Sequence, residues 1–187
     1  MKLPIYIYGM PVLRETAQDI NLQQKDALGV LVQDMFETLT ASNGVGLAAP
    51  QIGKALRVVV IDLNVLSEDY PEFKDFRHVY YNARILEYGE ETSTMEEGCL
   101  SLPGISEKVT RPTRVRVKYL DEQFQPHEEW VDGYLARVMQ HEFDHLDGHM
   151  FIDRISTFRR QMLKSKLSAF LKGKVRCSYK VKTLKKA

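Results

Sequence analysis

Apolar residues recur at helical spacing between positions 28 and 39, and this is the clearest regular pattern in the chain. Such spacing places them on one face of an amphipathic helix. Ser42, Asn43 and Gly44 follow directly, and residues of these types commonly end helices. The sequence therefore predicts a helix that leads into a glycine loop. Its apolar positions are Leu28, Leu31, Val32, Met35, Phe36 and Leu39.

Strand patterns follow in the middle of the chain. Residues 57–62 form a nearly continuous apolar run, whereas apolar and basic residues alternate over 114–119. Both patterns are typical of strands. Between the predicted strands 57–62 and 79–88 lies an acidic, aromatic stretch, roughly 64–77, which predicts a surface loop with no catalytic role. The predicted strands are 57–62, 79–88, 114–119 and 126–131.

Two further helices are predicted toward the C-terminus. The first ends at Gly148, and the second runs from Ser156, an N-cap residue, to Gly173. The whole pattern predicts an α+β fold, with small mixed or antiparallel sheets packed around a central helix and a helix at the C-terminus. The apolar face of the central helix comprises Leu135, Val138, Met139 and Leu146.

The composition is that of a chain with its own core. It has 187 residues, 44% of them hydrophobic, and no repeat or flexible linker divides it, so a single domain over 1–187 is expected. Cys99 and Cys177 cannot form a disulfide framework, which favours the cytoplasm. The N-terminus lacks a secretion signal, and no stretch approaches the ~20 apolar residues that span a bilayer. Neither secretion nor membrane insertion is expected.

Basic residues are concentrated at the C-terminal end. Residues 154–187 contain 12 Lys and Arg and no Asp or Glu, although the net charge of the chain is only +1. The remaining residues carry 14 bases and 25 acids. This pattern predicts a basic helix and tail on an acidic body, which would attract phosphate polymers or acidic surfaces. A solvated helix without a partner is the alternative.

The central helix carries the most informative motif, His-Glu-x-x-His at 141–145. Side chains four residues apart share a helix face, with Cβ atoms about 5–6 Å apart. His141 and His145 can therefore bind one metal ion while Glu142 reaches its water, which indicates metal-assisted attack on a carbonyl. The pattern also arises on ordinary exposed helices, so the third ligand decides the question.

Known arrangements of that third ligand can be compared with the sequence. Metzincins need a third His six residues after the second, where this chain has Phe151. Thermolysin-like enzymes use a later Glu, but the only acids after His145 are Asp147 and Asp153, and Asp153 follows too closely for the chain to return. Upstream, Cys99 lies at a predicted strand end and is the strongest candidate, although a cysteine alone is more often a small buried apolar residue.

Three segments together resemble the motifs of bacterial peptide deformylase. They are 44–53 (GVGLAAPQIG), 97–101 (EGCLS) and 140–148 (QHEFDHLDG), in the family's order. The surrounding α+β pattern is similar over nearly the whole chain, apart from 64–77 and the extreme C-terminus. The resemblance implies removal of the formyl group from the N-terminal formylmethionine of new polypeptides, which releases formate and a free amine.

The resemblance also implies residue roles. The metal ligands would be Cys99, His141 and His145, with Glu142 as general acid and base. Gln51 and the Leu100 amide would donate hydrogen bonds to the oxyanion, although a loop glutamine can equally cap neighbouring backbone. The implied substrate-binding residues are Gly44, Val45, Gly46, Gly98, Tyr134 and Val138.

Several of these substrate-binding residues have ordinary alternatives. Gly44 and Gly46 can permit a positive φ in a turn, or a close approach of the substrate backbone. Tyr134 and Val138, the implied methionine pocket, can be helix-face packing residues, and Arg137 places a charge beside them. No motif surrounds Cys177, His78, His127 or His149, which are assigned to packing or the surface.

The expected cofactor is one divalent ion per chain. Fe²⁺ is favoured by the resemblance, while the ligand set also accepts Zn²⁺, Ni²⁺ or Co²⁺. The expected partners are N-formylmethionyl nascent peptides and, through the basic C-terminal segment, the ribosome; no membrane contact is expected, and the chain is expected to be a monomer. The competing functions are another His-Glu-x-x-His metallopeptidase and a non-catalytic, metal-stabilised module that binds ribosomes.

Overall fold

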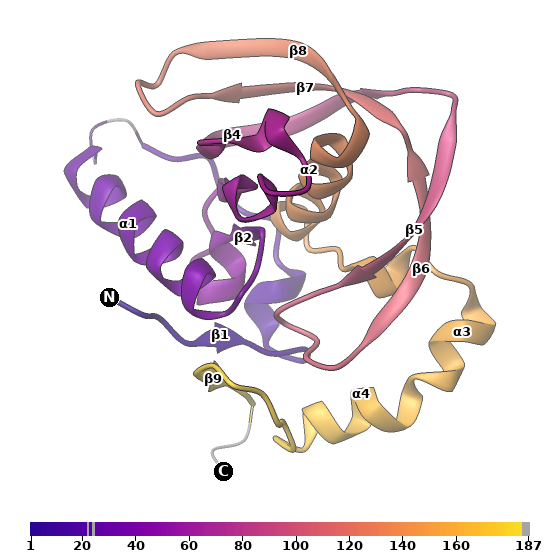
Figure 1. Cartoon of the computed structure of the whole chain (residues 1–187). Helices are drawn as coiled ribbons and strands as arrows, with labels where there is room; N and C mark the ends of the chain where they lie inside the picture. Colours follow the sequence, from indigo (N-terminus) through magenta and orange to yellow (C-terminus); the bar gives the residue numbers. More distant parts are fainter. Residues whose placement is uncertain (22, 24, 185–187) are drawn as a thin grey trace.

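A helix at the centre of the molecule organises the fold. The computed structural model describes residues 1–21, 23 and 25–184, and Figure 1 shows helix α2 (Gly133–Leu146) enclosed by strands on several sides. The helix packs against β2, β3, β4, β7 and β8 of one sheet. The predicted α+β class and the central helix are confirmed.

The described residues form three sheets, and neighbouring strands are antiparallel in the five-stranded sheet and in the β5–β6 sheet. The five-stranded sheet has the order β2-β3-β4-β7-β8, and β5 pairs with β6. The third sheet joins the two ends of the chain, because β1 and β9 pair in parallel. The strands are β1 (Ile5–Tyr6), β2 (Gly46–Ala48), β3 (Val58–Asp62), β4 (Arg77–Tyr88), β5 (Thr92–Gly98), β6 (Ser106–Pro112), β7 (Arg114–Leu120), β8 (Pro126–Asp132) and β9 (Val181–Lys182).

The remaining helices lie around this arrangement. The predicted first helix is α1 (Lys25–Ala41), which buries Leu28, Met35, Phe36 and Leu39. Short 3-10 turns occupy Pro11–Arg14, Ala49–Ile52, Asn64–Leu66, Pro71–Phe73 and Phe151–Asp153. Among the described residues, no helix is long and apolar enough to span a bilayer.

The four predicted strands all form, and their burial explains their patterns. Every residue of β3 is buried, because α1 packs against one side of β3 and α2 against the other, so its apolar run is continuous. In β7, Val115 and Val117 are fully buried while Arg114 and Lys118 are exposed, which accounts for the alternation. No bounds were predicted for β1, β2, β5, β6 or β9, which are short or rich in polar residues, although the strand end expected at Cys99 is the end of β5.

One prediction needs correction. The last helix is not continuous: α3 (Thr157–Met162) and α4 (Lys164–Leu171) meet at Leu163, whose φ of −80° and ψ of −9° interrupt the regular helix. Ser156 does cap it, because its hydroxyl accepts the Arg159 N–H. The predicted surface loop at 64–77 is confirmed, since none of its residues is fully buried, although it contains two 3-10 turns and half-buries Phe73.

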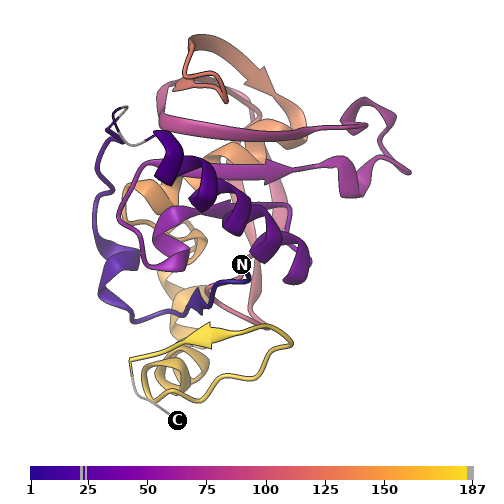
Figure 2. The ribbon, with the colours of Figure 1, turned by 90° about the vertical axis from the view of Figure 1, so that its left-hand side faces the viewer.

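The basic C-terminal segment folds back onto the body of the protein. Residues 174–184, here called the C-terminal arm, run beside β1 (Figure 2). The Ile5 N–H donates to the Lys180 carbonyl and the Ile7 N–H to the Lys182 carbonyl, each at 2.9 Å. Lys185 and Lys186, which were counted in the predicted tail, lie outside the described residues. The described part of this segment is therefore held against the N-terminal strand.

Candidate active site

A cleft of about 710 Å³ brings most of the predicted site residues together. Its walls come from the loop before β2, the end of β5, one face of α2 and the C-terminal arm. His145 lies beneath it and is only 1% exposed. The predicted residues that line the cleft are Gly44, Val45, Gly46, Gln51, Gly98, Cys99, Leu100, Tyr134, Val138, His141 and Glu142.

The three proposed metal ligands converge at the floor of this cleft. One ligand atom from each of Cys99, His141 and His145 lies within 4.8 Å of the other two, and Cys99 Sγ is 3.3 Å from His145 Nε2. These separations suit a thiolate and two imidazoles around a single small ion. Burial holds the pKa of His145 well below its usual value, so this imidazole is neutral, as a ligand must be. The residues present fit a divalent transition metal.

Glu97 orients the first of the two histidines. Its Oε2 lies 3.0 Å from His141 Nδ1, which leaves His141 Nε2 free for a metal. Burial raises the pKa of Glu97, but His141 and Arg111 outweigh this and hold the pKa far below its usual range. Burial lowers the pKa of His141, but hydrogen bonds with Cys99 and Glu97 outweigh burial and raise this pKa well above its usual value. Glu97 is therefore a permanent anion beneath the site.

A chain of buried ion pairs holds Glu97 in place. Arg111 donates to both oxygens of Glu97, at 2.7 and 3.0 Å, and to Asp144 at 2.8 Å. Asp144 belongs to the His-Glu-x-x-His turn of α2 and is 5% exposed. The paired charges therefore tie the end of β5 to the metal-binding helix. Sequence reasoning assigned no role to Glu97 or Asp144, although both lie inside the quoted motifs, and Arg111 had no local signal.

Glu142 faces the cleft without a fixed partner. The residue is 4% exposed, and its Oε2 has no hydrogen-bond partner among the described residues. Burial raises its pKa to about 7, while His141 and Arg111 act in the opposite direction. A carboxylate with a pKa near neutrality can both accept and return a proton.

Gly46 makes room for this carboxylate. A Cβ at position 46 would lie 2.5 Å from Glu142 Oε1, closer than real side chains approach. Neither Gly44 nor Gly46 has a positive φ, so the interpretation that these glycines permit a left-handed turn is wrong. At Gly44 a Cβ would meet Leu39 at 2.7 Å and Leu100 at 3.0 Å. A Cβ at either position would therefore require a neighbouring side chain of the protein itself to move.

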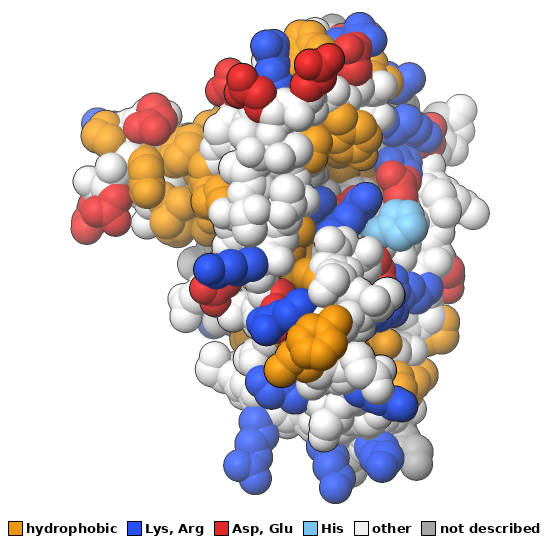
Figure 3. Space-filling model, turned by 90° about the vertical axis from the view of Figure 1, so that its right-hand side faces the viewer, with side chains coloured by type: hydrophobic (Ala, Val, Ile, Leu, Met, Phe, Trp, Pro, Cys, Tyr) orange, Lys and Arg blue, Asp and Glu red, His pale blue; other side chains and the backbone are white. Residues whose placement is uncertain are grey.

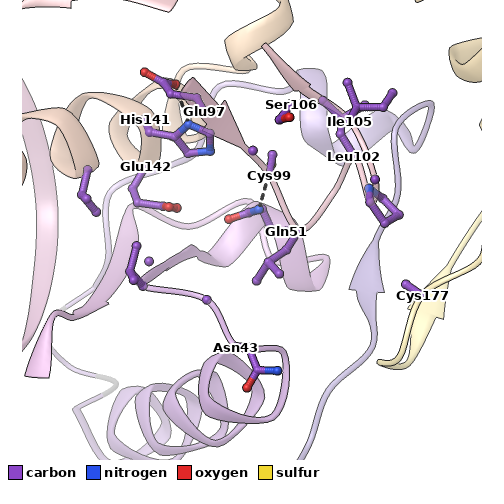
Figure 4. A pocket seen from close by; sticks show the side chains of 18 of the residues that line it. Asn43, Gln51, Glu97, Cys99, Leu102, Ile105, Ser106, His141, Glu142 and Cys177 are labelled. Carbon is purple, nitrogen blue, oxygen red and sulfur yellow. Dashed lines mark hydrogen bonds and ion pairs between the residues drawn. The ribbon is translucent and has the colours of Figure 1, made fainter. Parts of the chain in front are cut away.

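Gln51 directs its amide group toward the metal ligands. Its Oε1 accepts the Ala48 N–H at 2.9 Å, which fixes the orientation of the amide. Nε2 therefore donates, to Ser101 Oγ at 3.3 Å and toward Cys99 Sγ at 3.5 Å, the contact drawn in Figure 4. The side chain therefore caps neighbouring backbone through its oxygen and at the same time directs its nitrogen toward the cleft. The Leu100 N–H has no hydrogen-bond acceptor in the described part of the chain, so a second donor is available nearby.

The edge of the five-stranded sheet borders the cleft at Gly46. Gly46 is paired with Ile61, and the neighbouring Asp62 N–H donates to the Val45 carbonyl at 2.9 Å. Because hydrogen bonding alternates along antiparallel strands, the polar backbone groups of Gly46 point away from β3. Ala48 follows the same alternation, since its N–H is bound by Gln51. The edge at Gly46 can therefore pair with an extended peptide.

Tyr134 and Val138 line one end of the cleft from successive turns of α2. The Tyr134 ring also contacts Phe73, with ring centroids 6.4 Å apart, so the 64–77 stretch supports this wall. Arg137 does not leave a free charge among them. Its guanidinium donates to Glu97 at 2.9 Å and to the carbonyls of Val109 and Ser93. The wall at Tyr134 and Val138 thus remains apolar, because the charge of the neighbouring Arg137 is paired with Glu97.

The residues without motifs are mostly peripheral. His78 and His127 pair with Glu122 and Asp121 on an exposed face. Among the described residues, the only group arranged as a metal site is Cys99 with His141 and His145. Cys177 is exposed but also lines the cleft, from the C-terminal arm on the side opposite Gln51 (Figure 4).

The fold and the site define a class of protein. A thiolate and two imidazoles leave coordination positions open, and a buried carboxylate of raised pKa lies beside them. A sheet edge able to bind a peptide borders the same cleft. These features define a metal-dependent hydrolase that acts on peptides.

Comparisons with known proteins agree with this class of metal-dependent hydrolase and identify the family within it. Residues 2–161 match the family model described as polypeptide deformylase. A peptide deformylase of Salinibacter ruber is 40% identical and covers 98% of this chain and 95% of its own length. The chain belongs to the peptide deformylase family. The alternatives of another metallopeptidase and of a non-catalytic module are not favoured.

Solved structures agree with this assignment. The crystal structure of a peptide deformylase from Legionella pneumophila is 36% identical, covers 95% of this chain and 99% of its own, and superposes with a TM-score of 0.79. That of the Thermus thermophilus enzyme is 38% identical, covers 92% and 99%, and has a TM-score of 0.80.

Proposed function

We propose that this cleft removes the formyl group from N-formylmethionyl peptides, with Cys99, His141 and His145 holding a divalent ion. When bound, the ion supplies a Lewis acid and lowers the pKa of a coordinated water to about 7. The observation that carries the proposal is the unpartnered, buried carboxylate of Glu142 beside the ligand set. Glu142 takes the proton from the attacking water and returns it to the departing nitrogen.

Two donors stabilise the charge that develops on the formyl oxygen. Gln51 and Leu100 both line the cleft, the Gln51 amide is held by Ala48 and Ser101, and the Leu100 N–H has no acceptor among the described residues. Preorganised donors of this kind each contribute about 10²- to 10³-fold to the rate. The peptide pairs with the edge at Gly46 on one side and meets Gly98 on the other, while Tyr134 and Val138 receive the methionine side chain.

The test of the reaction is formate release from a formyl-Met tripeptide by anaerobically metal-loaded protein, beside the unformylated peptide and the Glu142→Gln variant. Formate that disappears in the folded, metal-loaded variant supports the mechanism. Metal-loaded wild-type protein that releases no formate contradicts the reaction. A variant that retains wild-type turnover contradicts the role of Glu142.

The oxyanion role of Gln51 has a matched control. Gln51→Ala is expected to lower kcat about 10²- to 10³-fold, with the metal retained. Gln140 is a glutamine of similar burial, 2% exposed, whose amide donates to the Pro112 and Ala136 carbonyls outside the cleft lining. Gln140→Ala is therefore expected to lower the melting temperature but to keep kcat. Equal rates for the two variants contradict the oxyanion role.

We propose Fe²⁺ as the physiological ion. Thiolate and imidazole ligands also accept Zn²⁺, Ni²⁺ and Co²⁺, so the ligand set alone does not select one metal. Elemental analysis of protein purified without oxygen from cells grown in ordinary medium tests this directly. Stoichiometric iron supports the proposal, and stoichiometric zinc in the same preparation contradicts it.

We further propose that the chain is a monomeric, single-domain cytoplasmic protein that contacts the ribosome through α4. Lys164 and Lys166 are exposed on this helix and Lys172 at its C-cap, and basic side chains gather over the lower part of the face in Figure 3. Reversal of these three charges is expected to reduce co-sedimentation with ribosomes at low salt. Reversal of Lys74, Lys108 and Lys118, equally exposed on other elements, is the control. Equal co-sedimentation of the two variants contradicts the contact.

A further inference from the structure

The metal ligand Cys99 begins a β-turn that carries several active-site groups. The Leu102 N–H donates to the Cys99 carbonyl at 2.9 Å, which closes the turn 99–102. This turn presents the Cys99 thiol, the free Leu100 N–H and the Ser101 hydroxyl that accepts from Gln51. Its conformation therefore sets the positions of a metal ligand and of both proposed oxyanion donors.

The part of a β-turn most easily changed is its central peptide. Type I and type II turns differ mainly in the orientation of this unit, here the Leu100 carbonyl and the Ser101 N–H. A rotation of this unit changes ψ of Leu100 and φ of Ser101, which displaces the groups on either side. A turn that must hold catalytic groups needs a contact that fixes this peptide.

Tyr179 provides such a contact from the C-terminal arm. Its hydroxyl donates to the Leu100 carbonyl at 2.8 Å, a link between residues far apart in the sequence. The Tyr8 N–H donates to the next carbonyl, that of Ser101, at 2.9 Å. Both carbonyls of the turn's central residues are therefore bound from outside the turn.

The two bracing residues belong to one structural unit. Tyr8 follows β1, Tyr179 precedes β9, and these strands pair with each other. Tyr179 is half-buried and, with Arg176, lines the cleft itself. The arm lies beyond residues 2–161, the part of the chain that the family model matches. Of the two bracing residues, Tyr179 therefore lies outside that matched region and Tyr8 inside it.

We propose that Tyr179 is a positioning residue for deformylation, whose hydroxyl holds the turn 99–102 in the conformation that presents the Leu100 N–H to the formyl oxygen. This inference rests on the proposed function of the cleft. Tyr179 acts through the Leu100 peptide and makes no contact of its own with the reacting atoms. Its effect belongs to the transition state, because the oxyanion forms only there.

The test is Tyr179→Phe, which removes the hydroxyl and keeps the ring. The expected result is a fall in kcat of up to about tenfold, the effect of one neutral hydrogen bond, with KM within about twofold of wild type. Hydrogen exchange of the Leu102 amide, measured on the same protein, is expected to become faster, since this amide closes the turn. This second measurement does not depend on activity.

The control is Tyr6→Phe. The Tyr6 hydroxyl accepts from Lys182 at 3.1 Å, so it joins the same two strands but does not line the cleft. This variant is expected to keep wild-type kcat and Leu102 exchange. A Tyr179→Phe variant with unchanged kcat in an active enzyme overturns the proposal, as does one in which only KM rises. If the wild-type protein releases no formate, the proposed function fails, and unchanged Leu102 exchange then overturns the brace itself.

Discussion

Gly46→Ala is the sharpest test of how the cleft is built, because a single methyl group meets the proposed general base. The new Cβ would lie 2.5 Å from Glu142 Oε1 and 2.8 Å from the Cδ and Cγ atoms, whereas ordinary contacts begin near 3.4 Å. The carboxylate must therefore move by about 1 Å, and a displacement of that size can lower a rate about 100-fold. General-base catalysis contributes about 10²- to 10⁴-fold, which sets the upper end of the loss.

The assay is formate release at saturating peptide, with metal content and melting temperature measured on the same samples. Overpacking of this kind typically costs about 1–3 kcal/mol, so the variant is expected to fold with a lowered melting temperature. Because none of the three ligands is touched, its metal content should equal that of wild type. The expected kcat is at least 100-fold below wild type.

Two further glycines separate the possible causes of the loss. A Cβ at Gly98 would meet only the Ile105 carbonyl, at 3.8 Å, so Gly98→Ala is expected to raise KM through the substrate and to spare Glu142. A Cβ at Gly29, in α1, would meet nothing within 4 Å, and Gly29→Ala is expected to keep full activity. A Gly46→Ala protein with kcat within threefold of wild type would refute the reasoning, because the carboxylate would then tolerate the methyl group.

The other predictions concern the buried charges. In metal-free protein the pKa of Glu142 is raised from 4.5 to about 7, so the folded state binds the proton more tightly than the unfolded state does, and stability falls as the pH rises from about 4.5 to 7. Denaturant unfolding of chelator-treated protein should show this fall, of about 3 kcal/mol at most, and Glu142→Gln should reduce it; equal pH dependence in the two proteins contradicts the assignment. Glu97→Gln leaves Arg137 without a buried anion, leaves Arg111 with Asp144 alone and releases His141, so it is expected to weaken metal binding about 10- to 100-fold in chelator competition and to lower the melting temperature. Glu96→Gln, on the exposed adjacent position, is its control and should change neither quantity.

The sequence predicted those parts of the molecule that depend on local periodicity or on a contiguous motif. The stripe from Leu28 to Leu39 produced α1, and the apolar run of β3 reflects the burial of both its faces, by α1 and by α2. The three proposed metal ligands could be identified from the sequence because two of them share a helix turn and the third lies in a quoted motif. Their local chemistry needed no knowledge of distant contacts.

The parts that sequence reasoning missed depend on long-range pairing. The strands β5 and β6 carry polar residues that neither alternate cleanly nor form an apolar run, and they are recognisable only once paired. Arg111 has no motif around it, yet it joins Glu97 to Asp144 beneath the site. The contact of Tyr179 with Leu100 spans 79 positions. Such partners are set by the tertiary structure, which local patterns do not encode.

The pairing of β1 with β9 has a consequence for the order in which the protein can fold during its synthesis. Tyr8 is synthesised before the turn that carries Cys99, and Tyr179 is synthesised 77 positions after Leu102, the last residue of that turn. The turn therefore cannot acquire both of its braces until translation has passed Tyr179. A protein that processes the first residue of other growing chains would thus finish assembling its own catalytic turn only after Tyr179 has emerged.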